Sequence, residues 1–316
     1  MNDDSNLFFQ ALHENSLEKM IKVPKSDLHN HVGRGGNIKY LSKLLGSDII
    51  PPSKSFESLD DMQAWFESNI KIHFPGLEGY LKRVEASFIQ ASHDIIKVLS
   101  MIYSIYEIEF LGGIEPFIKI MNGFHKKHAT DTLFYPELVL RETDDIDNEL
   151  AILDDIFSYQ WFKSVDWQGY EQSRNINLVQ PFFKKAREYG LKLRAHVGEF
   201  QDADYIKSCA EELDLDEIHH GINAVNSTTV MKFLADNRIQ LNVCPTSNIM
   251  LKRSKSYAEH QIRQLYDYGI KLTINTDDLL IFNSSVSEEY LKLFNAKVMS
   301  DVELDIIRKT GLMTYI

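Results

Sequence analysis

The feature that most constrains the fold is a regular alternation of apolar, strand-like segments with amphipathic helical patterns. The strand-like segments lie at about 24–32, 104–111, 133–141, 162–169, 191–197, 217–220, 239–245 and 271–276. Helical patterns lie between and after them at about 115–128, 146–158, 176–189, 203–213, 227–236, 258–268 and 286–297. This alternation is typical of parallel βα units, and eight such units close a barrel. The sequence therefore predicts the α/β class and a (β/α)8 TIM barrel.

Sequence outside this alternation predicts additional helices. Residues 7–20 form an amphipathic pattern at the N-terminus, and a long helical region follows the first strand. Ser58 is placed to cap one of the inserted helices, whereas the apolar stretch 88–103 is expected to pack outside the core. No Pro/Gly/Ser-rich linker or shift in composition divides the 316 residues. Residues 1–316 are therefore expected to form a single domain.

Composition argues against several classes of partner. The formal net charge of −12 and the pI near 5.4 disfavour nucleic acid, because phosphate contacts need clustered Lys and Arg. The most apolar run, 95–113, contains three charged residues and is not expected to span a membrane. Cys209 and Cys244 are too few for a disulfide framework, and the acidic N-terminus does not resemble a signal peptide. These features predict a cytoplasmic protein.

The first predicted strand carries His29 and His31. Residues two apart in a strand point to the same side, so both imidazoles are expected to face one space. This spacing alone is weak evidence, because core and surface histidines also fall two apart by chance. However, His196, His220 and Asp277 lie at or just after later strand ends, where barrels place their chemistry. Imidazole and carboxylate ligands with one open position are typical of a hydrolytic zinc site.

Six different short motifs follow one another along nearly the whole chain. They are Pro-Lys-x-Asp-Leu-His-x-His at 24–31, Val-Asp-x-x-Gly at 165–169, His-x-Gly-Glu at 196–199, His-Gly at 220–221, Cys-Pro-Thr-Ser-Asn at 244–248 and Asn-Thr-Asp-Asp-x-Leu-Ile-Phe at 275–282. In these motifs the sequence resembles the adenosine deaminase family of metal-dependent amidohydrolases. Members of that family are zinc enzymes on a (β/α)8 barrel, so the resemblance implies the same fold that the alternation predicts.

The resemblance also implies roles for individual residues. It implies one zinc ion with four ligands, namely His29, His31, His196 and Asp277. Glu199 would be the proton shuttle facing purine N1, and His220 would steady the attacking hydroxide. Asp278 would contact N7, and the backbone of Gly169 would hold N3. Two of the ligands have a second expected role: His31 in substrate binding, and Asp277 in catalysis as an acceptor of the water proton.

The residue types agree with this chemistry. Glu199 lies three residues beyond a predicted ligand at a strand end, so it can reach a substrate without joining the ligand set. Consecutive side chains diverge, so Asp277 can face the metal while Asp278 faces the substrate. By the same rule His219 is expected to point away from His220 and to be structural.

One position departs from the family pattern. Members that act on adenosine usually carry an acid shortly after His-x-His, where it receives the ribose 5′-hydroxyl. Here Gly33 stands in that place, followed by Arg34 and two further glycines. An arginine in a glycine-rich turn suits phosphate, which predicts that AMP or dAMP is accepted at least as well as the nucleoside. The alternative is that Arg34 points to solvent and the glycines form a turn.

The sequence therefore predicts zinc-dependent hydrolytic deamination of an adenine nucleoside or its 5′-monophosphate, which is the expected small-molecule partner. A second hypothesis keeps the metal and changes the substrate to adenine, an N6-alkylated purine or another aminated heterocycle. A third is a non-catalytic barrel that serves as a module in an assembly. The combination of Glu199, His220, Asp277 and Asp278 argues against the third, because binding alone does not require all four.

Overall fold

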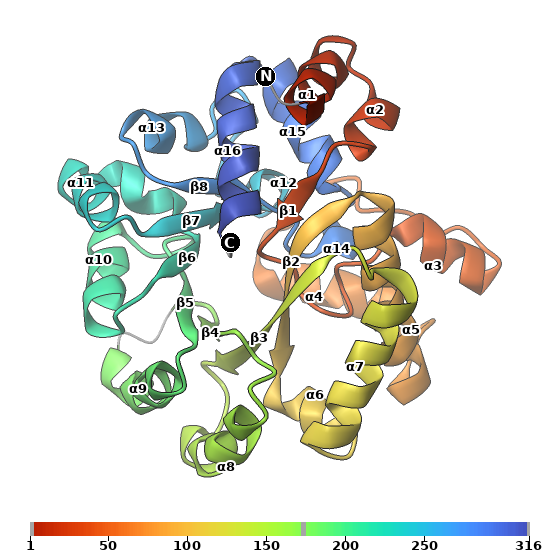
Figure 1. The fold of residues 1–316 in the computed structure, drawn as a ribbon, viewed down its shortest axis with the longest axis vertical. Coiled ribbons are helices and arrows are strands. Elements are labelled where there is room, and N and C mark those ends of the chain that lie inside the picture. The colour runs from red at the N-terminus through yellow and green to blue at the C-terminus, as the bar shows by residue number, and fades with distance from the viewer. Residues whose placement is uncertain (1–2, 172–174, 315–316) are drawn as a thin grey trace.

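The computed structural model describes residues 3–171 and 175–314. Within these residues, eight parallel strands form one sheet in sequential order, with helices outside it (Figure 1). The strands are β1 (Lys25–Asp27), β2 (Ile96–Ser104), β3 (Leu133–Arg141), β4 (Ser164–Gln168), β5 (Lys192–Val197), β6 (Glu217–His220), β7 (Gln240–Val243) and β8 (Leu272–Ile274). Just beyond β1 and β8, the Asp277 N–H donates to the His29 carbonyl at 2.8 Å, which brings the first and last strands together.

Helices follow the strands as parallel βα units require. They are α6 (Ile105–Phe110), α7 (Ile114–His128), α8 (Ile146–Ser158), α9 (Gln180–Glu188), α10 (Ala203–Glu212), α11 (Thr228–Asp236), α12 (Pro245–Met250), α13 (Ile262–Asp267), α14 (Leu279–Phe282), α15 (Val286–Asn295) and α16 (Asp301–Met313). Short 3₁₀ turns, η2 (Ile176–Leu178) and η3 (Ile222–Asn226), follow β4 and β6. The predicted (β/α)8 TIM barrel is confirmed.

The predicted N-terminal helix is split into α1 (Asp3–His13) and α2 (Leu17–Ile21). Asn15 has a φ of 50°, which ends α1, and the Ser16 hydroxyl accepts the Lys19 N–H to begin α2. At the other end of the chain, α16 packs on β1 and β8. Gly311 permits this approach, because a Cβ there would lie 2.0 Å from the Ser26 hydroxyl.

The predicted second strand is wrong. Residues 105–110 form helix α6, and the strand is β2, which lies in the stretch 88–103 except for its last residue, Ser104. That stretch was expected to pack outside the core. The Glu107 carboxylate accepts the Ser104 N–H at 2.7 Å, which starts a helix at this point. A barrel strand is covered on both faces and reads as a continuous apolar run, so the alternation in 104–111 was misleading.

The segment between β1 and β2 forms a second apolar layer over the barrel. It contains α3 (Ile38–Leu45), α4 (Leu59–Phe66), the π-helical turn η1 (Glu67–Lys71) and α5 (Gly76–His93). The Ser58 hydroxyl accepts the Asp61 N–H and caps α4 as predicted. Phe66 and other apolar side chains of this segment pack on Leu251, after α12, and on α14. Because these partners follow β7 and β8, the inserted segment covers the carboxyl ends of the strands.

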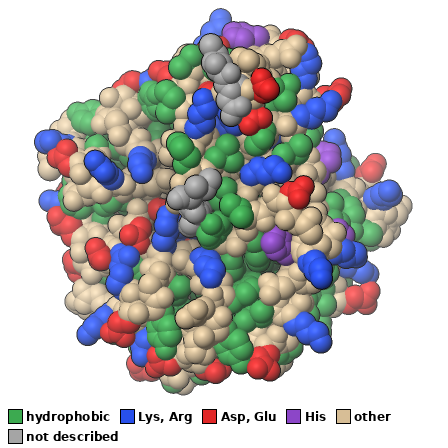
Figure 2. All heavy atoms as spheres, viewed as in Figure 1, with side chains coloured by type: hydrophobic (Ala, Val, Ile, Leu, Met, Phe, Trp, Pro, Cys, Tyr) green, Lys and Arg blue, Asp and Glu red, His purple; other side chains and the backbone are tan. Residues whose placement is uncertain are grey.

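The surface agrees with the acidic but mixed composition. On the face shown in Figure 2, acidic and basic side chains are interspersed. Across residues 3–171 and 175–314, no helix combines the length and apolar character that crossing a bilayer requires.

Candidate metal centre and active site

Four side chains from distant parts of the chain meet at the carboxyl ends of the strands. The Nε2 atoms of His29 and His196 lie 2.9 Å apart, and His31 Nε2 lies 3.2 Å from Asp277 Oδ1. His29 Nε2 lies 3.8 Å from the same carboxylate oxygen. Tetrahedral zinc with bonds of about 2.0–2.2 Å separates its ligand atoms by roughly 3.3–3.6 Å. These three distances bracket this range, and the ring centroids of His29, His31 and His196 lie 4.6–5.4 Å apart, so the four residues are close enough to share one ion.

The electrostatics of these residues also suit a cation. Burial lowers the pKa of His29 well below its usual value and that of His196 to about 3, so both imidazoles are neutral, as metal ligands must be. Burial also acts to lower the pKa of His31, but the carboxylates of Asp278 and Asp277 outweigh it and raise that pKa to about 9. These carboxylates favour positive charge at this point, which a metal ion held here would supply in place of the proton.

Asp166 lies close to one of the predicted ligands, although its carboxylate oxygens and His196 Nδ1 do not meet hydrogen-bond geometry in the structure. Its Oδ2 lies 2.8 Å from His196 Nδ1, on the ring edge opposite Nε2. A carboxylate in this position directs the other ring nitrogen toward a metal and increases its basicity. The sequence interpretation assigned no role to Asp166, although it lies in the Val-Asp-x-x-Gly motif on β4, the strand next to β5. An acid on the neighbouring strand was the signal that could have identified it.

Replacing Asp166 with asparagine is expected to weaken zinc binding by about 10–100-fold, because the oriented, basic imidazole is lost. Competition with a zinc chelator measures the affinity of the variant against that of the wild-type protein. Asp155→Asn, the same change at an exposed helical position, is expected to leave the affinity unchanged. Equal affinity in Asp166→Asn and the wild-type protein would contradict the orienting role.

Glu199 lies beside the metal centre, close to His220 and Asn248. Its Oε2 is 3.6 Å from His220 Nε2, and its Oε1 is 3.4 Å from Asn248 Nδ2. Burial, assisted by the carboxylates of Asp277 and Glu171, raises the pKa of Glu199 well above its usual value. A buried carboxyl group with a raised pKa is suited to carry a proton and donate it.

The two adjacent histidines of β6 do not point in opposite directions. His220 has a φ of 63°, which breaks the alternation of the strand. The ring centroids of His219 and His220 therefore lie 4.1 and 4.7 Å from that of His29. The expected divergence is wrong for this backbone reason. His219 Nε2 lies 2.8 Å from the buried Glu137 carboxylate, a contact that fits the structural role predicted for it.

The adjacent aspartates have different hydrogen-bond partners, although both carboxylates lie close to His31. Asp277 accepts a hydrogen bond from the Ser247 hydroxyl at 2.6 Å and faces the histidines. Asp278 instead accepts from Arg34 Nη1 at 3.0 Å. Among the described residues, Asp278 Oδ1 and Asn248 Oδ1 are buried without a hydrogen-bond partner. Buried polar atoms are nearly always paired, so these two atoms are available to a bound substrate.

Arg34 lies within the site rather than in solvent. Its Nη2 donates to Gln63 Oε1 of α4 at 2.5 Å, and its guanidinium carbon lies 4.5 Å from the centre of the Phe66 ring. The side chain is 27% exposed. Arg34 therefore joins Asp278 to the inserted segment, a connection that the sequence interpretation did not anticipate because it depends on where α4 packs.

Gly169 lies one residue beyond the end of β4, at the same end of the barrel as the metal centre. A Cβ at this position would lie 2.4 Å from the side chain of Glu142, which itself accepts the Tyr170 N–H. A side chain at this position would require Glu142 to move. Contact with purine N3 stays a prediction.

The site is covered by the inserted segment. Glu199 and Asp277 are each only 6% exposed. Tyr170, after β4, donates its hydroxyl to Asp60 of α4, and the Phe56 N–H donates to the Met250 carbonyl at 2.8 Å. These contacts hold the inserted segment over the barrel mouth.

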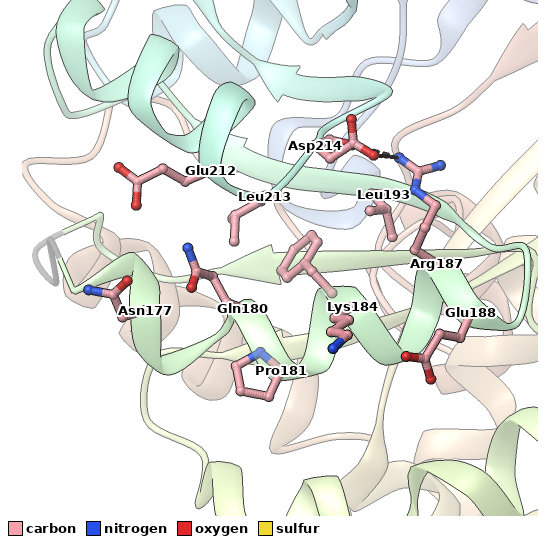
Figure 3. A pocket seen from close by; sticks show the side chains of 11 residues that line it. Asn177, Gln180, Pro181, Lys184, Arg187, Glu188, Leu193, Glu212, Leu213 and Asp214 are labelled. Atoms are coloured by element: carbon pink, nitrogen blue, oxygen red, sulfur yellow. Dashed lines mark hydrogen bonds and ion pairs between the residues drawn. The ribbon is translucent and has the colours of Figure 1, made fainter.

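A cavity of about 830 Å³ lies away from the metal centre, between α9 and α10 (Figure 3). Leu193, near the amino end of β5, contributes to its wall, and Arg187 pairs with Asp214 at its rim. None of the predicted site residues lines it.

Comparisons with known proteins agree with this arrangement. A sequence profile described as adenosine deaminase matches residues 132–314, more than half of the chain. The adenosine deaminase of Clostridium acetobutylicum is 30% identical over 327 residues, which cover 94% of each chain. A Treponema pallidum protein assigned as an adenosine/adenine deaminase is 27% identical over 304 residues, covering 92% of this chain and 98% of its own.

A solved structure shows the same fold. The N6-methyl-AMP deaminase of Arabidopsis thaliana aligns with a TM-score of 0.77 and 16% identity, covering 94% of this chain and 93% of that one. The matching sequence profile and the relative that aligns over nearly the whole chain show that the protein belongs to the adenosine deaminase family, as a hydrolytic deaminase built on a TIM barrel.

Proposed function

We propose that the protein is a zinc-dependent hydrolase that removes the 6-amino group from an adenine nucleoside or its 5′-monophosphate. The observation that carries this proposal is the meeting of His29, His31, His196 and Asp277 around one point, with Glu199 buried beside them. Zinc held by these four residues supplies Lewis acidity, which lowers the pKa of water from about 15.7 to about 7.

The reaction adds the oxygen of water to C6, breaks the C6–N6 bond and releases ammonia. The intact purine ring resists attack at C6 unless N1 takes a proton. Glu199 supplies that proton, which the raised pKa of its buried carboxyl supports. Asp277 accepts the proton that water loses and passes it to the amino group, which leaves as ammonia, while the proton of the new C6 hydroxyl returns to Glu199. His220 steadies the attacking oxygen. The Asp278 carboxylate contacts N7, and the Gly169 backbone holds N3.

Ammonia release from a panel of adenine, adenosine, deoxyadenosine, AMP and dAMP tests the proposal. The zinc-loaded protein is expected to convert at least one nucleoside or nucleotide to its inosine-type product. N6-methyl-AMP belongs in the panel because the Arabidopsis protein of the same fold is named for that substrate. If adenine is the only compound turned over, the substrate is the free base rather than a nucleoside or nucleotide. No turnover of any member would overturn the proposed function.

Arg34 is the residue that we propose for the 5′-phosphate. Gly33 replaces the acid that would repel an anion, and the Arg34 guanidinium carries more N–H groups than its bonds to Asp278 and Gln63 use. Arg34→Ala is expected to lower kcat/KM for AMP by about 10–100-fold, the value of a charge-assisted hydrogen bond, and that for adenosine by much less.

Arg34→Ala also leaves Asp278 without its ion pair, which affects the turnover of both substrates. The difference between AMP and adenosine in the same variant therefore reports the loss of the phosphate contact alone. Lys82→Ala is the matched control, because Lys82 is a cation on the same inserted segment that pairs with Glu78 at 2.7 Å. This control is expected to leave both substrates unaffected. Equal losses for AMP and adenosine in Arg34→Ala would exclude a phosphate contact.

A further inference from the structure

The Glu171 carboxylate is enclosed by the backbone of the loop that carries Glu199. Its Oε1 accepts the N–H groups of Glu199 and Phe200, each at 2.9 Å. Its Oε2 accepts those of Gly198 at 2.8 Å and Gln201 at 3.1 Å. Glu171 is 2% exposed. Four consecutive N–H groups directed at one buried carboxylate define the backbone path of residues 198–201.

The carbonyl groups of the same loop are held from the opposite side. Asn223, in η3 after β6, donates its N–H to the Gly198 carbonyl at 2.9 Å. Its side-chain Nδ2 donates to the carbonyls of Glu199 at 3.2 Å and Gln201 at 2.8 Å. The backbone of Glu199 is therefore fixed at its N–H by the loop after β4 and at its carbonyl by the loop after β6.

Glu171 also connects two segments that face the substrate in the proposed reaction. It lies two residues after Gly169, and its own carbonyl accepts Gln201 Nε2 at 2.6 Å. Glu171 therefore joins the segment that carries Gly169 to the loop that carries Glu199. Proton transfer requires placement within a fraction of an ångström, and a misplacement of about 1 Å costs about 100-fold in rate.

We propose that Glu171 is a positioning residue that holds the 198–201 loop so that Glu199 faces the ring nitrogen it protonates. This inference rests on the proposed function. Glu171 touches neither the substrate nor the metal ligands, and it acts through the backbone of Glu199. Its replacement is therefore expected to affect the proton-transfer step rather than zinc binding.

The test compares Glu171→Gln with Asp94→Asn. Asp94 is also a buried carboxylate that accepts a backbone N–H, from Ser287 at 3.2 Å, but it lies at the opposite end of the barrel near the start of β1. Glu171→Gln is expected to lower kcat by about 100-fold with KM changed less than about threefold. Asp94→Asn is expected to lower thermal stability with kcat within about threefold.

A double-mutant cycle distinguishes positioning from general destabilisation. In a Glu199→Gln background, adding Glu171→Gln is expected to lower the residual kcat by less than about threefold, because the group it positions is already gone. Additive losses would overturn the inference while leaving the proposed function intact. A wild-type protein without deaminase activity would instead overturn the proposed function and this inference with it.

Two measurements do not depend on turnover. Glu171→Gln is expected to keep about one zinc ion per chain, since no ligand changes, and loss of zinc would overturn the inference. Hydrogen exchange of the amides of residues 198–201 is expected to be at least about tenfold faster than in the wild-type protein, and unchanged exchange would overturn it. If Glu171→Gln does not fold, Asn223→Ala replaces it in the same cycle, with an expected kcat loss of about tenfold and the same criteria.

Discussion

Replacing Glu199 with glutamine is expected to lower kcat by about 10²–10⁴-fold while KM changes less than about threefold. Glutamine keeps the size of the side chain and its contact with Asn248, but it has no proton to give to the ring. The loss therefore falls on the transition state rather than on substrate binding. Steady-state ammonia release with the best substrate of the panel measures both constants.

The zinc content of the Glu199→Gln protein must equal that of the wild-type protein, because Glu199 is not one of the four proposed ligands. Glu211→Gln is the matched control: it makes the same change at an exposed position on α10, the helix that follows the same strand. We expect Glu211→Gln to retain full activity. A Glu199→Gln protein that keeps more than about a tenth of the wild-type kcat would exclude this residue as the proton donor.

Replacing Asp277 with asparagine is expected to lower kcat/KM by at least about 10³-fold, together with loss of the metal. Asp277 is the carboxylate that lies within 3.8 Å of both His29 and His31, so the change removes the one anionic ligand of the proposed set. It also removes the acceptor for the proton that water loses. Elemental analysis gives the zinc content, and the ammonia assay gives the activity.

Chelation provides the same test without a mutation. A chelator is expected to abolish the activity of the wild-type protein, and added zinc is expected to restore it. Added zinc is not expected to restore Asp277→Asn. The control is Asp267→Asn, at an exposed carboxylate paired with Arg263, which is expected to keep both zinc and activity. An Asp277→Asn protein with wild-type zinc content and turnover would rule out the proposed ligand set.

The sequence predicted the barrel because seven strands, β1 and β3 to β8, lie where the alternation placed them. It misplaced β2, since an apolar run buried on both sides looks like a packed helix, while residues 104–111 alternate but begin a helix. Such errors arise where burial, which depends on the whole fold, outweighs the local pattern.

The candidate site was predictable to the extent that it depends on motifs at strand ends. The structure brings His29, His31, His196 and Asp277 together, and their roles as ligands stay predictions. The bend at His220 was not predictable, because a positive φ leaves no mark on the strand pattern. The contacts of Arg34 and Glu171 were also beyond the sequence, since each joins segments whose proximity only the packed structure defines.

Anomalous diffraction at the zinc absorption edge, from crystals of the zinc-loaded protein, tests the proposed centre most directly. We predict a single strong peak about 2.0–2.2 Å from His29 Nε2, His31 Nε2, His196 Nε2 and the Asp277 carboxylate, with the Glu199 carboxyl nearby but outside bonding distance. A peak bound instead between Asp166 and His219, or no peak among these residues, would contradict the metal centre and the proposed deamination with it.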